Sequence, residues 1–60
     1  MYRIWSKIFK NGELIGTSVS VKSYVRKGNA IRVAKKRYDV PRGDISFTWI
    51  VSEINPFNEN

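Results

Sequence analysis

The sequence predicts a two-layer α+β domain in which a three-stranded, antiparallel or mixed sheet of strand order 2-1-3 carries one helix on one face. Three observations support this fold class. The Asn11-Gly12 pair, a strong hairpin signal, separates two runs of alternating apolar and polar residues. Apolar residues then recur with helical spacing over about 24–38, and a third alternating run covers 45–54. The 60 residues form a single domain of marginal stability, since so short a chain buries only about 60% of its unfolded surface.

The hairpin is expected to span residues 2–21 with Asn11 and Gly12 as its two turn residues. In that register Lys10 faces Glu13 with opposite charge, and Phe9 faces Leu14. The register gives three further pairs: Ile8 with Ile15, Trp5 with Ser18, and Ile4 with Val19.

Alternation along the strands then sorts the hairpin side chains into two faces. The face expected to form the core holds Tyr2, Ile4, Ile8, Ile15, Val19 and Val21, with Ser6 and Thr17 among them. The other face holds Arg3, Trp5, Lys7 and Phe9 on the first strand, opposite Leu14, Gly16, Ser18 and Ser20 on the second.

The helical segment has one apolar stripe, as a helix packed on a sheet requires. The stripe holds Tyr24, Ala30, Ile31, Ala34 and Tyr38. The Gly28-Asn29 pair suits a helix entry better than a helix interior, so we expect a firm helix from about Asn29, with Asn29 as N-cap, after a looser turn from Ser23. Pro41 and Gly43 end this segment.

The third strand places apolar residues on one side and mostly polar residues on the other. Ile45, Phe47, Trp49 and Val51 fall on the first side, and Ser46, Thr48, Ile50 and Ser52 on the second. A right-handed crossover through the helix puts this strand beside the first strand, which is then central. The helix would cover one sheet face and leave the other open, with residues 55–60 as a flexible tail.

The net charge of +6 is concentrated in one part of the chain. The segment from Lys22 to Arg42 holds eight basic residues and one acidic residue, Asp39, whereas the remainder holds three basic and four acidic residues. This distribution points to an anionic partner such as nucleic acid, a membrane surface or an acidic protein. A charge of this size also serves solubility in small proteins.

Catalysis is not expected, because the sequence has no His and no Cys and its five carboxylates show no spacing that pairs them over a substrate. We therefore predict that the chain is not an enzyme and holds no metal or cofactor. The four glycines match no phosphate-binding loop. No stretch approaches the roughly 20 apolar residues of a membrane helix, so we predict a cytoplasmic protein that does not insert into membranes.

Two surfaces are candidates for binding nucleic acid, either DNA or RNA. On the open sheet face, Trp5 and Phe9 can stack on bases while Arg3 and Lys7 contact phosphates. The outward side of the helix offers a second set of phosphate contacts, Arg26, Arg32, Lys36 and Arg37. The two surfaces face in opposite directions, so a single duplex can hardly touch both.

Two functions follow from these surfaces. The leading hypothesis is a small basic, non-catalytic nucleic-acid-binding module. The alternative is a protein-interaction module that forms a homodimer through the open sheet face, where Trp5, Phe9, Leu14 and Ile50 form an apolar patch. In that case the charge serves solubility or an acidic partner.

Overall fold

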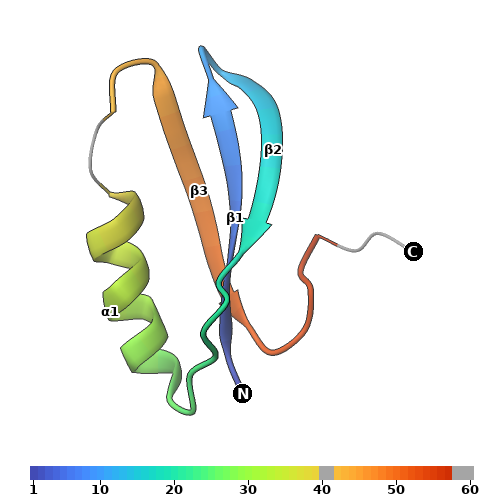
Figure 1. Ribbon diagram of the computed structural model, residues 1–60, viewed down its shortest axis with the longest axis vertical. Coiled ribbons are helices and arrows are strands. Elements are labelled where there is room, and N and C mark those ends of the chain that lie inside the picture. The colour runs from blue at the N-terminus through green and yellow to red at the C-terminus, as the bar shows by residue number, and fades with distance from the viewer. Residues whose placement is uncertain (40–41, 58–60) are drawn as a thin grey trace.

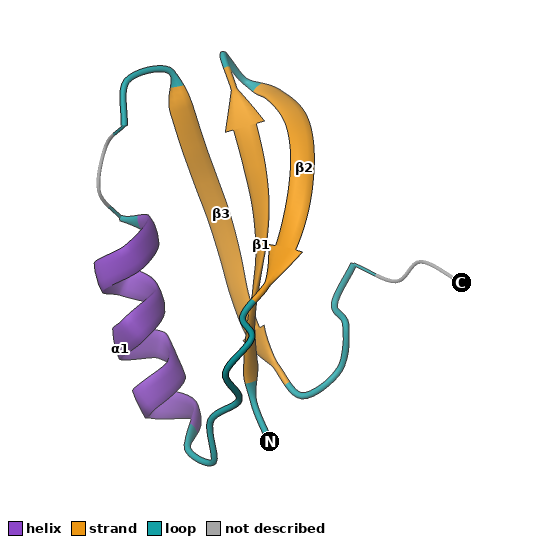
Figure 2. Ribbon diagram, in the orientation of Figure 1, coloured by secondary structure: helices purple, strands orange, loops and turns teal. Residues whose placement is uncertain are grey.

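The computed structural model describes residues 1–39 and 42–57 and shows a β-β-α-β chain (Figure 1). Its elements are β1 (Arg3–Lys10), β2 (Glu13–Val19), α1 (Lys27–Tyr38) and β3 (Ile45–Ser52). The sheet order is β2-β1-β3, and β1 pairs antiparallel with both neighbours. Figure 2 shows the single helix beside the sheet, with β2 as the strand farthest from it. The predicted fold class and central first strand are confirmed.

The hairpin turn adopts the left-handed backbone that the Asn11-Gly12 pair predicts. Asn11 has φ 52° and Gly12 has φ 81°, a conformation that asparagine and glycine tolerate best. The adjacent pairs, Lys10 with Glu13 and Phe9 with Leu14, are also as predicted. The Asn11 N–H donates to the Asp44 carbonyl at 2.9 Å, which ties the turn to the start of β3.

The turn gives a first prediction. Gly12→Ala should lower the free energy of unfolding by about 1 kcal/mol, because an L-residue resists positive φ while a Cβ at this position would meet no atom within 4 Å. Gly16→Ala is the matched control, since its Cβ also meets nothing within 4 Å and its φ is not positive. Urea unfolding of both variants makes the comparison. Equal losses in the two variants would show that backbone strain is not the cause.

Beyond the first two pairs the predicted hairpin register is wrong. Ile8 pairs with Gly16 and Phe9 with Leu14, so Ile15 has no partner on β1 and forms a β-bulge. The bulge moves every later pair by one position: Lys7 faces Thr17, Ser6 faces Ser18 and Trp5 faces Val19.

From Gly16 onward the bulge reverses the two faces of β2, and it leaves those of β1 unchanged. Thr17 and Val19 lie on the side of Trp5, and Gly16 and Ser18 lie on the side of Ile8 and Ser6. Ser20 is buried, where its hydroxyl accepts from the Ile4 N–H at 3.0 Å and donates to the Lys22 carbonyl at 2.8 Å. The predicted core positions Val19 and Val21 are instead 40% and 99% exposed, and Ile15 is also exposed.

The position of the helix explains why small residues suit the inner face of β2. Within the described chain α1 packs against β3 and β1 and does not reach β2. Large apolar side chains on the inner face of β2 would therefore have no helix to pack on. Instead, Ser18 and Ser6 share a hydrogen bond of 2.6 Å there, with Ser6 fully buried.

The core lies between α1 and the β1–β3 pair. Its fully buried members are Ile4, Ala30 and Ala34, and Val51 is 8% exposed. Larger side chains pack around them: Tyr2, Tyr24, Ile31, Val33, Tyr38 and Trp49. The predicted helix stripe is confirmed for Ala30, Ile31, Ala34 and Tyr38, whereas Tyr24 packs on the core from before the helix. The inward side of the third strand is also confirmed, because Ile4 pairs with Val51 and Ser6 with Trp49.

The helix begins at Lys27, within the predicted segment of about 24–38 but before the firm start predicted at about Asn29. Its N-cap is Arg26, with extended φ and ψ and no side-chain hydrogen bond to the first turn, so the predicted N-cap role of Asn29 is wrong. Asn29 lies within α1 and is exposed. Tyr2 and Tyr24 exchange backbone hydrogen bonds of 2.6 and 2.7 Å just before the helix, and this pairing fixes where the chain enters it. In the described chain no helix has the length and apolar character needed to cross a bilayer.

Candidate functional site

Exposed basic residues lie on the outward side of α1 and at its N-terminal end, and we call them the basic helix face. It comprises the predicted residues Arg26, Arg32, Lys36 and Arg37, and all four are exposed. Lys35 on its flank and Lys27 in the first turn are also exposed. The helix sequence contains no acidic residue. The basic helix face therefore presents cations from one end of the helix to the other.

Helix stability explains only part of this charge. Lys35, Lys36 and Arg37 lie in the last turn, where cations favourably oppose the helix dipole. Arg26 and Lys27 lie at the opposite end, where positive charge is unfavourable and acidic residues are preferred. Sequences that depart from local stability rules often do so at functional positions. An anionic ligand along the helix would compensate for the two N-terminal cations.

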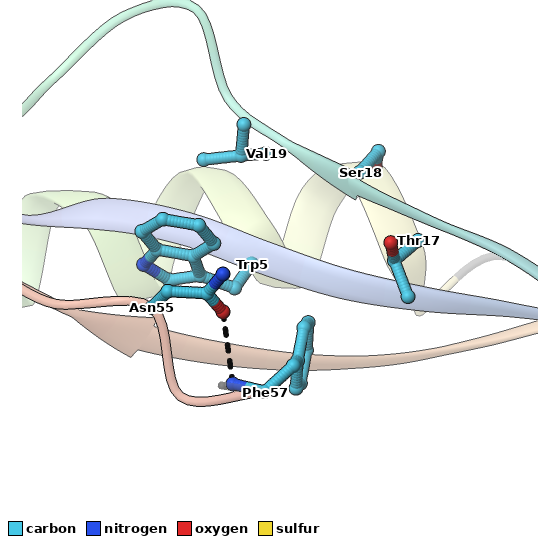
Figure 3. Close-up of a pocket in the computed structure, with 6 residues that line it drawn as sticks. All are labelled: Trp5, Thr17, Ser18, Val19, Asn55 and Phe57. Atoms are coloured by element: carbon cyan, nitrogen blue, oxygen red, sulfur yellow. Dashed lines mark hydrogen bonds between the residues drawn. The ribbon is translucent and has the colours of Figure 1, made fainter. Parts of the chain in front are cut away.

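The opposite side of the sheet, which we call the outer sheet face, carries the aromatic site predicted from the sequence. Trp5 lies on the side away from α1 and is flanked by Val19 on β2 and Ile50 on β3 (Figure 3). Its indole N–H donates to the Ser52 carbonyl at 3.1 Å, which fixes the orientation of the ring. Lys7 and Phe9 are half-buried on the same face, and Arg3 is exposed.

The outer sheet face is not fully open, because the chain after β3 returns across it. The Ile54 N–H donates to the Ser52 hydroxyl at 3.2 Å, and the Phe57 N–H donates to Asn55 Oδ1 at 2.9 Å. The Lys7 ammonium lies 4.9 Å from the centre of the Phe57 ring, in cation–π contact. The expectation of a fully open face is therefore wrong, because residues 55–57 of the expected tail lie against it. Residues 58–60 lie outside the described chain.

Asn55 and Phe57 are the site residues that sequence reasoning missed. Together with Trp5, Thr17 and Val19 they line a pocket of about 430 Å³ on the outer sheet face, and Ser18 also borders it although its hydroxyl bonds to Ser6 on the other side of the sheet (Figure 3). One signal for them was present in the sequence, namely a large aromatic residue directly after Pro56 in an otherwise polar terminus.

No protein-family model, curated protein or solved structure significantly matches this chain.

The geometry therefore offers two separate surfaces, and neither resembles a catalytic centre. Among residues 1–39 and 42–57, no three His, Cys, Asp or Glu side chains gather into a group that could hold a metal ion. The absence of a metal, a cofactor and an enzymatic activity stays a prediction. The basic helix face offers positive charge, and the outer sheet face offers an aromatic pocket, on opposite sides of the sheet.

Proposed function

We propose that this protein is a small, non-catalytic nucleic-acid-binding module whose basic helix face contacts the phosphate backbone. The observation that carries the proposal is the pair of cations, Arg26 and Lys27, at the helix end where they oppose the dipole. Exposed arginine and lysine side chains along one helix match the regular charge of a sugar-phosphate backbone. We expect this contact to be independent of base sequence, because phosphates carry no sequence information. A cytoplasmic location remains part of this proposal.

The proposal is tested by fluorescence anisotropy with labelled duplex and single-stranded oligonucleotides of DNA and RNA at two salt concentrations. We expect binding at low salt that weakens steeply as salt rises, because phosphate contacts release condensed counterions. Scrambled sequences should bind equally well. No binding of any of the oligonucleotides at low salt would overturn the proposal.

The cap position of the helix gives a second prediction. Arg26→Asp should raise the free energy of unfolding by about 1 kcal/mol, because aspartate can cap the first turn and complements the dipole. It should also weaken nucleic-acid binding by removing one cation and adding an anion. Arg26→Ala, which removes the charge without supplying a cap, separates the two effects. Thermal unfolding and anisotropy measure them, and an Arg26→Asp protein that binds as tightly as the wild type would exclude Arg26 from the interface.

A second candidate function, homodimerisation through the outer sheet face, is favoured by its exposed apolar side chains. Leu14, Val19 and Ile50 are 50%, 40% and 47% exposed on the face that also bears Trp5. Exposed apolar side chains gathered on one face often mark a protein interface. Sedimentation equilibrium tests it: a dimer that Ile50→Asp converts to a monomer supports this candidate. A wild-type protein that stays monomeric at high concentration excludes it.

A further inference from the structure

The pocket on the outer sheet face has the size and walls of a small-ligand site. Its volume of about 430 Å³ lies within the range of roughly 300–1,000 Å³ that is common for such sites. Trp5 and Phe57 supply aromatic walls from β1 and from the returning segment, and Val19 supplies an aliphatic wall from β2 (Figure 3). Because the Trp5 indole is anchored to the Ser52 carbonyl, its ring is already oriented before a ligand arrives.

The polar groups around the pocket suit the edge of a heterocyclic ring. Asn55 uses its Oδ1 to accept the Phe57 N–H, which leaves its Nδ2 to donate to a ligand. The hydroxyl of Thr17 lies at the other end of the pocket and can donate or accept (Figure 3). A donor and a hydroxyl beside two aromatic rings are the groups that hold unstacked bases in single-strand-binding proteins.

Positive charge lies next to the pocket on the same face. Lys7 holds its ammonium 4.9 Å from the Phe57 ring. Arg3 is exposed, two residues before Trp5 on β1 and therefore on the same side of the sheet. Arg3 and Lys7 thus lie on either side of Trp5 along β1, and either cation could contact the phosphate of a base in the pocket.

We propose that this pocket binds one unstacked nucleobase, which stacks on the Phe57 ring beside Trp5 and has its edge hydrogen-bonded to Asn55 and Thr17. Only the assignment of this base to a single strand of nucleic acid rests on the proposed function. It shares no residue with the basic helix face, so an uncharged nucleoside tests it independently of phosphate binding. The shared chemistry, a base with its sugar, can come from a free nucleotide or from a strand.

The test is a titration of the ¹⁵N-labelled protein with adenosine or uridine, with their 5′-monophosphates and with matching trinucleotides, followed by NMR. The two tryptophan indole N–H signals act as probe and reference, because Trp5 lines the pocket and Trp49 packs on the helix side. We expect the Trp5 indole and Asn55 side-chain amide signals to move with both nucleosides or one of them, while the Trp49 indole signal stays. Tighter binding of trinucleotides than of monophosphates assigns the site to a strand, and equal binding assigns it to a free nucleotide. If neither nucleoside shifts these signals, the pocket proposal fails, whatever the result for the basic helix face.

The matched variants are Phe57→Ala and Phe9→Ala, which each remove one phenyl ring from the outer sheet face. Phe57→Ala should weaken nucleoside binding by about 5- to 150-fold, the equivalent of about 1–3 kcal/mol per stacked base. Phe9 does not line the pocket, so this proposal gives the stacking role predicted for Phe9 to Phe57 instead. Phe9→Ala should therefore bind within about twofold of the wild type. Phe57→Tyr keeps the ring and should restore binding, and far-UV circular dichroism checks that each variant is folded. Equal weakening by Phe57→Ala and Phe9→Ala would place the base elsewhere and overturn the proposal.

Discussion

Ile4→Ala should remove about half of the protein's free energy of unfolding. Ile4 is fully buried in the core. It lies in the central strand, directly opposite Val51. Truncating such a side chain costs about 2–5 kcal/mol, whereas a 60-residue domain has only about 3–9 kcal/mol of total stability. The core has few other buried apolar residues, so this loss is a large share of the free energy of unfolding. Urea titrations followed by far-UV circular dichroism measure it.

Ile50→Ala is the matched control, because it removes the same atoms from the other face of the sheet. Ile50 is 47% exposed beside Trp5, so we expect a loss of about 1 kcal/mol or less. The comparison also bears on the dimer candidate. A loss for Ile50→Ala as large as that for Ile4→Ala, growing with protein concentration, would show that the outer sheet face is buried between two copies in solution.

The strand pattern of β1 and β3 was enough to predict which way Trp5 points. These two strands pair without a bulge, so placing Ile4 and Ile8 on the helix side puts Trp5 on the other side. The pattern on β2 misled the prediction, because Ile15, Val19 and Val21 alternate as core residues would. Two facts that local sequence does not encode decide the outcome: α1 does not reach β2, and the hydroxyl of Ser20 satisfies the Ile4 N–H.

For the helix and the terminal segment, too, the sequence predicted some features correctly and missed others. The apolar stripe predicted which side of α1 packs on the sheet, and thereby the exposed basic side. Its first turn was mispredicted because Gly28 and Asn29 are weak helix formers, and the backbone pairing of Tyr2 with Tyr24 overrides that preference. Phe57 was missed because its place depends on contact with Lys7, fifty residues earlier in the chain. Such a long-range contact leaves no periodic pattern in the sequence.

Replacing two cations in the middle and last turns of α1 should have the largest effect on binding. We expect Arg32→Ala with Lys36→Ala to weaken duplex binding roughly a hundredfold at about 50 mM salt, since each lost phosphate contact forfeits the release of nearly one counterion. Both side chains are exposed, so the free energy of unfolding should change by less than about 1 kcal/mol. Anisotropy titrations measure the affinity. The charge-matched control replaces Lys10 and Lys22, which are exposed outside the helix, and should bind nearly as the wild type does.

The salt dependence of duplex binding tests the basic helix face most directly. The slope of the logarithm of the binding constant against the logarithm of salt concentration changes by about 0.9 for each phosphate contact. We predict that the variant lacking the Arg32 and Lys36 charges has a slope smaller in magnitude by about 2 than the wild type, and that the Lys10 and Lys22 control keeps the wild-type slope. Identical slopes for the wild type and both double variants would contradict the account, because the phosphate contacts would then not lie on this helix.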